Sequence, residues 1–313
     1  MRGAALVGLG AHRPARREDN TAVAERTGST DAWIRERSGI VTRGVAGPDE
    51  TVVEMAVSAG AKALAAAGVD PLDVGLVLVA TCTLTQPVPG ASASVAARLG
   101  AHRSGALDLG AACAGFTYGL SLAADTVRAG STDVVLVIGS ERFSDIVDPT
   151  DRGTAFLFGD GAGAGVVQVS DVDGIAPAAW SSDGGSADVL RTAGSPPVLH
   201  MEGRAVYRWA TTTVPGLARE ACARAGVELS DLAAFVPHQA NLRITEALVR
   251  SLALPEHVVV ARDVVDSGNT SAASVPLALS RLVELGQVRR GDPVLLLGFG
   301  AGLTAAGQVV RCP

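Results

Sequence analysis

Long runs of consecutive apolar residues recur along the chain and are interrupted by polar turns. Within these runs polar and apolar positions do not alternate, so a strand built from such a run is covered on both faces. Strands of this kind are typical of sheets that carry helices on both sides. The runs predict strands at seven places: 4–10, 74–81, 133–140, 162–169, 232–238, 293–300 and 305–310.

Alanine-rich stretches of helical length lie between these runs. Strands that alternate with helices predict a layered α/β fold. We expect helices over six stretches: 50–67, 91–99, 113–129, 207–225, 242–252 and 271–286.

A weak internal repeat relates the two ends of this pattern. Residues 113–140 resemble residues 271–300, because each has small residues that open a helix, then a polar turn with an aspartate, then an apolar strand. Residues 158–169 likewise resemble residues 299–310. The repeat predicts a chain made of two similar halves.

The boundary between the halves is predicted from composition. Residues 170–205 are rich in Gly, Ser, Asp and Pro, which predicts a long surface loop. We therefore divide the chain into an N-terminal half, residues 1–170, and a C-terminal half, residues 171–313.

Charge and hydropathy narrow the class of protein. The formal net charge is −6, without the clustered basic charge of a nucleic-acid-binding surface. The chain has no uncharged apolar stretch of about 18 residues, the length needed for a membrane helix. The apolar run at the N-terminus is too short for a signal peptide. We expect neither a nucleic-acid partner nor a membrane span.

The cysteines do not indicate a metal site. The chain has four cysteines, which form no C-x-x-C pair and no spacing with histidine typical of zinc: Cys82, Cys113, Cys222 and Cys312. A chain of this size with so few cysteines favours a reducing, cytoplasmic location over a disulfide framework.

The glycine-rich stretches do not predict a phosphate-binding loop. In residues 159–165 the glycines run directly into an apolar strand, whereas a dinucleotide-binding loop opens a helix. A P-loop needs a lysine after its glycines, and the only lysine is Lys62. We expect neither NAD nor ATP, and no other cofactor.

One cysteine is a candidate nucleophile. Cys113 follows the strand-like stretch 105–109 and precedes a helical stretch, with alanines and glycines around it. A lone cysteine is more often a small buried hydrophobe. At the start of a helix, however, the macrodipole and the free N–H groups lower the pKa of a thiol. We therefore expect Cys113 to have a lowered pKa and room for a substrate beside it.

Two other segments carry polar candidates. His238 ends an apolar strand, Asn241 follows it, and Asn269 lies in a glycine-flanked turn before the helix that begins near Ser271. On its own, each has an ordinary interpretation as a buried histidine, a helix N-cap or a turn residue. In the repeat, however, the Asn269 turn takes the place that Cys113 takes in the first half. Two related halves that share a centre would bring Cys113, His238 and Asn269 together.

Six ordered stretches, taken together, resemble one family. They are DAWIRERSGIVTR (31–43), GAACAGFTYGL (110–120), DRGTAFLFGDGAGA (151–164), VPHQANLRI (236–244), GNTSAASVP (268–276) and GFGAGL (298–303). Over essentially its whole length the chain resembles β-ketoacyl-acyl-carrier-protein synthase III. The asparagine of GNTSAAS separates that family from elongating ketosynthases and from thiolases. The resemblance implies a thiolase-like α/β fold with two pseudo-symmetric halves layered α-β-α-β-α.

The resemblance implies a two-step covalent reaction. Cys113 would take an acyl group from acyl-CoA, and the enolate formed by decarboxylation of malonyl-acyl-carrier protein would attack it. His238 and Asn269 would donate hydrogen bonds to the enolate oxygen. The backbone N–H groups of Cys113 and Ala301 would form the oxyanion hole. Such a reaction starts fatty-acid or polyketide synthesis.

Binding residues for coenzyme A are implied in the same way. Trp33 and Arg152 would sandwich the adenine ring, since stacking on Trp and on an Arg plane suits a purine. Arg37 would lie near the phosphates and Asn241 near the pantetheine.

The resemblance also implies two protein partners. Basic residues near the tunnel mouth would dock the acidic carrier protein, namely Arg208, Arg243 and Arg250. Val88 would close the acyl pocket of a partner subunit, which implies a homodimer. Because valine is small, it would leave room for a branched or longer starter group.

Two other functions stay open at this point. An acyltransferase of the same fold could move the acyl group from Cys113 to an alcohol or amine, but it would not need Asn269. A non-catalytic subunit that binds carrier protein would not need Cys113. Release of CO2 from malonyl-acyl-carrier protein distinguishes the first alternative, and an acyl adduct on the protein distinguishes the second.

Overall fold

The first of the two five-stranded sheets is formed by residues up to position 170. The computed structural model describes residues 2–86 and 88–313. The sheet has five strands in the order β1-β7-β6-β4-β5. Its strands are β1 (Gly3–His12), β4 (Leu76–Ala80), β5 (Gly105–Leu109), β6 (Val134–Glu141) and β7 (Gly161–Ser170).

The second sheet repeats the first. Its order, β8-β14-β13-β11-β12, matches the first sheet strand for strand. In both sheets each pair of neighbours among the first three strands is antiparallel, and each pair of neighbours among the last three is parallel. The strands are β8 (Ala179–Ser182), β11 (Ala234–Pro237), β12 (Val259–Val260), β13 (Pro293–Gly300) and β14 (Thr304–Arg311).

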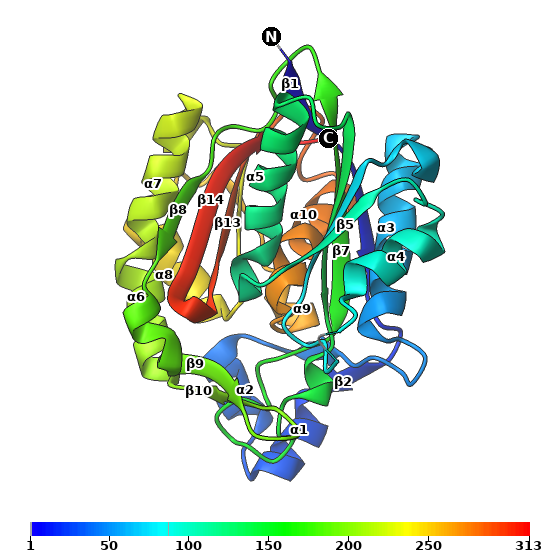
Figure 1. Ribbon diagram of the computed structural model, residues 1–313. Helices are drawn as coiled ribbons and strands as arrows, with labels where there is room; N and C mark the ends of the chain where they lie inside the picture. The colour runs from blue at the N-terminus through cyan, green and yellow to red at the C-terminus, as the bar shows by residue number, and fades with distance from the viewer. Residues whose placement is uncertain (1, 87) are drawn as a thin grey trace.

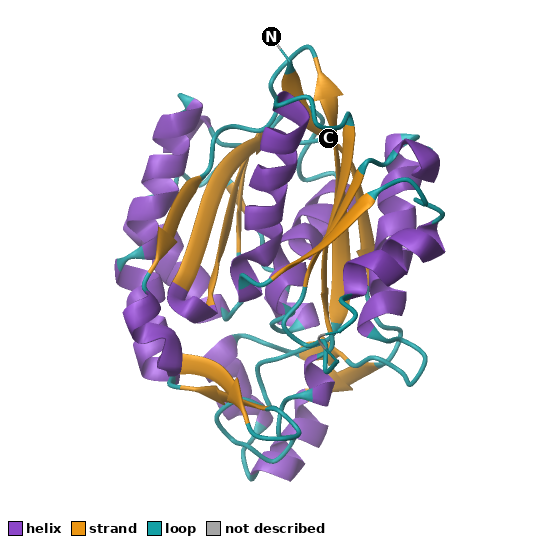
Figure 2. Cartoon of the chain, in the orientation of Figure 1, coloured by secondary structure: helices purple, strands orange, loops and turns teal. Residues whose placement is uncertain are grey.

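Helices form three layers around the two sheets (Figures 1 and 2). The helices α5 (Gly115–Arg128) and α10 (Ser274–Glu284) lie between the sheets, and each contacts both of them. The first sheet is covered outside by α3 (Val52–Ala67) and α4 (Ala91–Leu99). The second is covered by α6 (Gly203–Thr212), α7 (Val214–Ala225) and α8 (Leu242–Leu252). The predicted α-β-α-β-α arrangement is confirmed.

Small residues permit this close packing. Every residue of β6 is buried, and on α5 the core-facing positions include Phe116, Leu120, Ala123 and Ala124. Apolar surface removed from water stabilises the fold by roughly 25 cal/mol per Å². The glycine-rich run 159–165 leads into a strand, as predicted, but its residues from Gly161 on already belong to β7 and do not form the predicted turn.

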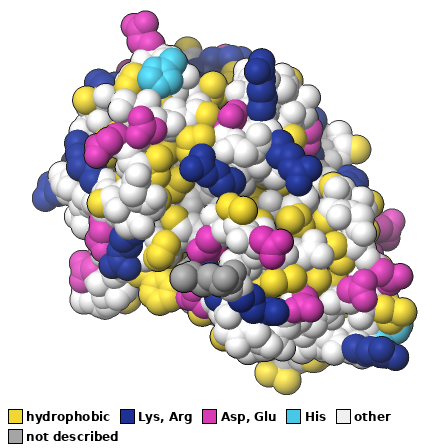
Figure 3. Space-filling model, turned by 90° about the horizontal axis from the view of Figure 1, so that it is seen from above, with side chains coloured by type: hydrophobic (Ala, Val, Ile, Leu, Met, Phe, Trp, Pro, Cys, Tyr) yellow, Lys and Arg dark blue, Asp and Glu magenta, His cyan; other side chains and the backbone are white. Residues whose placement is uncertain are grey.

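A cap of short elements covers the end of the sheets where α5 begins (Figure 1). It contains the ribbon of β2 (Arg17–Asp19) and β3 (Thr42–Gly44). The helices α1 (Asn20–Thr27), α2 (Asp31–Ser38) and α9 (Val264–Ser267) also belong to it. The opposite face, which carries both termini, mixes acidic, basic and apolar side chains (Figure 3).

Two sequence-based expectations differ from the structure. The predicted helix over residues 207–225 is divided at Thr213 into α6 and α7, because Pro215 has no N–H to continue the helical bonding. The predicted loop over residues 170–205 contains β8 and a hairpin of β9 (Leu190–Ala193) and β10 (Val198–Met201). These strands are short and rich in turn residues at their ends, so they carry little apolar pattern.

The two halves share a strained turn as well as a strand order. One-turn 3₁₀ helices precede the two central helices, at Ala112–Ala114 before α5 and at Ser271–Ala273 before α10. Both begin with a non-glycine residue in the left-handed region, Ala112 at φ 44° and Ser271 at φ 47°. β7 ends at Ser170 and β8 begins at Ala179, on either side of the predicted division at residue 170.

In the part of the chain that the structure describes, no helix is both long and apolar enough to cross a bilayer.

Candidate active site

Cys113 lies in the turn that opens α5, as predicted. It is buried, and its neighbour Gly115 lets the helix start against Ala80 at the end of β4. Gly300 packs directly on the cysteine, since a Cβ there would lie 2.6 Å from the Cβ of Cys113 and 2.8 Å from its Sγ. Only glycine fits at position 300.

The predicted lowering of the Cys113 pKa is wrong. Burial raises the pKa of this thiol to about 11. The hydroxyl of Ser271 and the backbone N–H groups of Ala301 and Cys113 stabilise the thiolate, but they offset the loss of hydration only in part. Cys113 is therefore a thiol near neutral pH, because desolvation outweighs the effect of the helix start.

A raised pKa predicts how Cys113 responds to alkylation. The thiolate is the reactive form, so its alkylation by iodoacetamide should rise by about tenfold per pH unit from pH 7 to pH 10. Peptide mapping by mass spectrometry would measure this rate at Cys113 and, as an internal comparison, at the other three cysteines. A rate that levels off by pH 8 would contradict a pKa near 11.

His238 follows directly on β11 and is held by three contacts. Its backbone N–H donates to Leu297 O of β13 at 2.7 Å, and its ring meets Phe299 edge-on at 5.2 Å. Its Nδ1 lies 2.7 Å from Oγ of Ser274. Burial lowers the pKa of His238 to about 3, so the imidazole is neutral at physiological pH.

Asn269 is fixed by backbone pairing to the segment before β7. Its N–H donates to Leu157 O at 2.8 Å, and its carbonyl accepts from Gly159 N at 3.0 Å. Gly268, at φ 69°, supplies the backbone conformation that the turn requires. The side-chain Oδ1 of Asn269 accepts from Ser271 N at 2.9 Å. The Nδ2 group is therefore the end of the amide available to donate into the pocket.

A buried carboxyl group connects the turn that carries Asn269 to a neighbouring loop. Glu141, at the end of β6, accepts from Thr83 Oγ1 at 2.8 Å, from Cys82 N at 3.0 Å and from Ala272 N at 3.4 Å. Burial raises the pKa of this carboxyl. The contacts connect the loop after β4 to the turn that carries Asn269.

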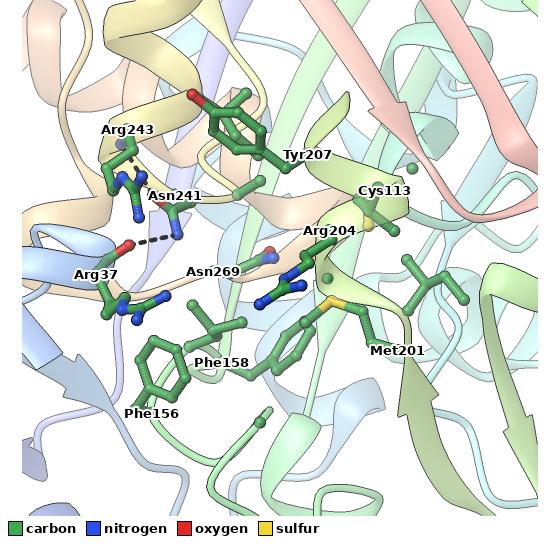
Figure 4. Close-up of a pocket in the computed structure, with 18 of the residues that line it drawn as sticks. Arg37, Cys113, Phe156, Phe158, Met201, Arg204, Tyr207, Asn241, Arg243 and Asn269 are labelled. Carbon is green, nitrogen blue, oxygen red and sulfur yellow. Dashed lines mark hydrogen bonds between the residues drawn. The ribbon is translucent and has the colours of Figure 1, made fainter. Parts of the chain in front are cut away.

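These residues open onto one large pocket of about 910 Å³. Cys113, His238 and Asn269 all line it, so the structure brings the three predicted residues together. Its apolar wall includes Phe156, Leu157, Phe158, Leu190 and Met201 (Figure 4).

The pocket is strongly basic. Five arginines line it, namely Arg37, Arg152, Arg204, Arg208 and Arg243. Among the described residues, no aspartate or glutamate lines the pocket. Within the described ranges 2–86 and 88–313, none of the five forms an ion pair. Unpaired guanidinium groups around a pocket favour an anionic ligand.

Trp33 lines this pocket and is in contact with two of the arginines. The guanidinium carbon of Arg152 is 4.9 Å from the centre of the Trp33 ring, and that of Arg37 is 5.5 Å away. Trp33 also meets Phe156 edge-on at 5.1 Å. Asn241 caps α8 through Arg243 N, and its Nδ2 donates to Arg37 O at 3.1 Å.

The three arginines predicted to dock a carrier protein lie close together. Arg208 is exposed on α6, and Arg243 lies 5.7 Å over the ring of Tyr207. Arg250 lines a second hollow that shares Tyr207 and Arg243 with the main pocket. Val88, by contrast, is 85% exposed and does not line the main pocket of its own chain.

The sequence analysis did not single out three residues of the site. Arg204 opens α6, and in the view of Figure 4 its side chain lies between those of Asn269 and Phe158. Glu141 and Ser274 reach the site only through the packing of distant segments. The sequence around each of these three residues contains no motif that would have indicated a role in the site.

Solved structures share this fold and cover almost the whole chain. The priming β-ketosynthase from the R1128 polyketide biosynthetic pathway is 48% identical, with a TM-score of 0.98, and the match covers 100% of this chain and 97% of that one. The 3-oxoacyl-[acyl-carrier-protein] synthase III of Aquifex aeolicus VF5 is 35% identical, with a TM-score of 0.95 over 99% of this chain and 100% of that one.

Fold and site together define a condensing enzyme of the thiolase fold. Residues 107–184 match the 3-oxoacyl-[acyl-carrier-protein (ACP)] synthase III family, and residues 222–312 match its C-terminal family. β-Ketoacyl-[acyl-carrier-protein] synthase III 4 of Streptomyces coelicolor is 52% identical over 99% of each chain. The chain belongs to the β-ketoacyl-acyl-carrier-protein synthase III family.

Proposed function

We propose that this enzyme transfers an acyl group from acyl-CoA to Cys113 and then condenses it with malonyl-acyl-carrier protein. The observation that carries the proposal is the content of one pocket: a buried cysteine, two neutral donors and five arginines without ion pairs. The product, a β-ketoacyl-acyl-carrier protein, would start fatty-acid or polyketide synthesis.

In the first half-reaction, the Cys113 sulfur attacks the thioester carbonyl of acyl-CoA. The thiol loses its proton, the C–S bond to CoA breaks, and free CoA takes up a proton as it leaves. The negative charge that develops on the carbonyl oxygen needs donors. The N–H groups of Cys113 and Ala301, which already point at the sulfur, are placed to supply them.

In the second half-reaction, malonyl-acyl-carrier protein loses CO2 and leaves an enolate. The enolate oxygen would accept hydrogen bonds from His238 and from Nδ2 of Asn269. Both groups are neutral and buried, so they stabilise developing charge without an ion pair. The enolate carbon attacks the acyl carbonyl, and collapse of the tetrahedral intermediate expels the Cys113 thiolate.

The arginines would bind the carriers of both substrates. Trp33 and Arg152 would sandwich the adenine ring once Arg152 moves off the Trp33 ring, which it contacts at 4.9 Å here, and Arg37 and Asn241 lie next to them. The exposed group of Arg208, Arg243 and Arg250 would face the acidic carrier protein, since opposite charges speed and orient such an encounter. Loss of CO2 and cleavage of the acyl thioester supply the driving force, so the reaction as proposed needs no cofactor.

Two sequential assays test this function. Intact-protein mass spectrometry after mixing with acetyl-, propionyl- and isobutyryl-CoA should find one acyl group per chain. Addition of malonyl-acyl-carrier protein should then remove the adduct and release one CO2 per acyl group. An acyl-enzyme that releases no CO2 would instead indicate transfer to an alcohol or amine.

We also propose that the enzyme is a homodimer built on β5. In the described part of the chain this strand pairs on one side only, with β4. Leu109 of β5 reaches Gly119 of α5. The exposed side chains Leu107, Leu122 and Trp180 extend the same apolar face, with Trp180 stacked on Tyr118. An edge strand of this kind is self-complementary about a twofold axis, which favours a second copy of this chain.

A charge on β5 should separate the subunits. Leu107 is 50% exposed, so Leu107→Glu leaves the core of the subunit intact while it places repelling charges at the proposed interface. Light scattering should give twice 31.6 kDa for the wild type and 31.6 kDa for the variant. Leu285→Glu, at another exposed leucine, is the control and should stay dimeric. A wild type that elutes as a monomer would contradict the dimer.

In this dimer, Val88 would influence which acyl-CoA the enzyme accepts as its starter. Its exposed side chain is free to reach a partner subunit, where a small residue at the end of the acyl pocket leaves room for a branched chain. Isobutyryl-CoA should therefore acylate Cys113 at least as fast as acetyl-CoA. A strong preference for acetyl-CoA would refute this assignment.

The four free cysteines suit a reducing compartment, and we place the enzyme in the cytoplasm.

A further inference from the structure

Ser274, the first residue of α10, lies behind the histidine of the site. Its hydroxyl oxygen is 2.7 Å from Nδ1 of His238 and 3.2 Å from the backbone N of Gln239. Ser274 and Gln239 have no exposed surface, and His238 is almost completely buried. Every proton in this group must therefore find a partner within the protein.

The number of protons available determines their positions. A serine hydroxyl has one proton and two acceptor positions, and a backbone N–H can only donate. Gln239 N–H thus donates to the Ser274 oxygen. In the described part of the chain the Ser274 hydroxyl contacts no carbonyl, so Nδ1 of His238 is its one acceptor.

The opposite arrangement is strongly disfavoured. If His238 carried its proton on Nδ1, that N–H would donate to the Ser274 oxygen, and the serine proton would have no acceptor. A buried donor without an acceptor costs its full desolvation. A doubly protonated ring is excluded as well near neutral pH, because burial lowers the pKa of His238 to about 3.

We propose that Ser274 is a positioning residue that fixes His238 as the Nε2–H tautomer. In a neutral imidazole with Nδ1 occupied as an acceptor, the one N–H lies on Nε2. Phe299, edge-on to the ring, restrains its orientation. Ser274 itself does not line the pocket and acts through the histidine.

This assignment deepens the proposed function and rests on it for its catalytic meaning. Nε2–H of His238 and Nδ2–H of Asn269 are then both donors, and Ser271 N orients the second as Ser274 orients the first. Such a pair suits an oxygen that gains negative charge. His238 would donate a hydrogen bond throughout the reaction and would not serve as a base.

The tautomer can be measured without any substrate. Long-range ¹H–¹⁵N NMR of enzyme labelled at histidine distinguishes a protonated ring nitrogen from an unprotonated one, and His238→Gln identifies the signals of His238 among the five histidines. The wild type should have a proton on Nε2 and none on Nδ1 of His238. A proton on Nδ1 in the wild type would overturn the proposal.

Kinetics of the two half-reactions test the consequence. Ser274→Ala should lower the rate of CO2 release from malonyl-acyl-carrier protein by about 10- to 100-fold, comparable to losing the partner behind a metal-bound histidine. Acylation of Cys113 should stay within about twofold of the wild type, which also shows that the variant is folded. Ser274→Cys retains a weak donor and should recover part of the rate.

Ser280 provides the matched control. It lies on the same helix and is buried, and its hydroxyl has no partner among the described residues. Ser280→Ala should change neither the NMR signals of His238 nor the release of CO2. CO2 release by Ser274→Ala at the wild-type rate would also overturn the proposal. If the wild type formed no acyl adduct, the proposed function would fail, while the NMR result would still decide the tautomer.

Discussion

Replacement of Cys113 by alanine should abolish the acyl-enzyme completely. Among the described residues that line the pocket, Cys113 is the one thiol, and none is a lysine. After incubation with any acyl-CoA in the panel, intact-protein mass spectrometry should find the variant at its unmodified mass. Because alanine is smaller and apolar, the turn and α5 should keep their structure.

A second buried cysteine serves as the control for this variant. Cys222 lies on α7, is buried in the core and does not itself line the pocket. Cys222→Ala should form the acyl adduct as the wild type does. An adduct that persists in Cys113→Ala, or one that disappears in Cys222→Ala, would place the nucleophile elsewhere.

The Asn269→Asp variant should separate the two half-reactions. Aspartate retains an oxygen that can accept from Ser271 N, so the turn is kept, but it has no N–H to donate into the pocket. Loss of one such donor typically lowers a rate by about 10²- to 10³-fold. CO2 release from malonyl-acyl-carrier protein should fall by that factor, measured by trapping of labelled CO2.

Acylation is the internal comparison for Asn269→Asp. The oxyanion of the first step is bound by backbone N–H groups, so acyl-CoA should still load Cys113 to completion. If loading and CO2 release fall by the same factor, Asn269 supports the structure of the whole pocket and has no specific role in decarboxylation. Unchanged CO2 release would exclude it as a donor to the enolate.

The fold could be predicted from the sequence mainly where strands are buried on both faces. Runs such as 133–140 and 293–300 became β6 and β13 with at most a one-residue difference at either end, because a continuous apolar run has few alternatives in an α/β chain. The hairpin of β9 and β10 was missed, since each strand has only four residues and most of them are half-exposed or exposed. The internal repeat also predicted correctly that the chain folds as two similar halves.

The site was predictable in position but not in electrostatics. Three stretches far apart in the sequence indicated Cys113, His238 and Asn269, and the structure brings them to one pocket. The direction of the Cys113 pKa was predicted wrongly, because it depends on how deeply Gly300 and the surrounding turns bury the sulfur. Ser274 and Glu141 could not be found, since their contacts bridge segments that only the fold brings together.

The matching turns before α5 and α10 have a consequence for the history of this chain. Ala112 and Ser271 occupy equivalent left-handed positions in two sheets with the same strand order, which is what duplication and fusion of one ancestral gene would leave behind. The residue after each differs: the first turn carries Cys113, and the second carries Ala272. An ancestor with two identical turns would have had to serve both roles with one sequence. After fusion, each copy could specialise, one in forming the covalent bond and the other in stabilising charge.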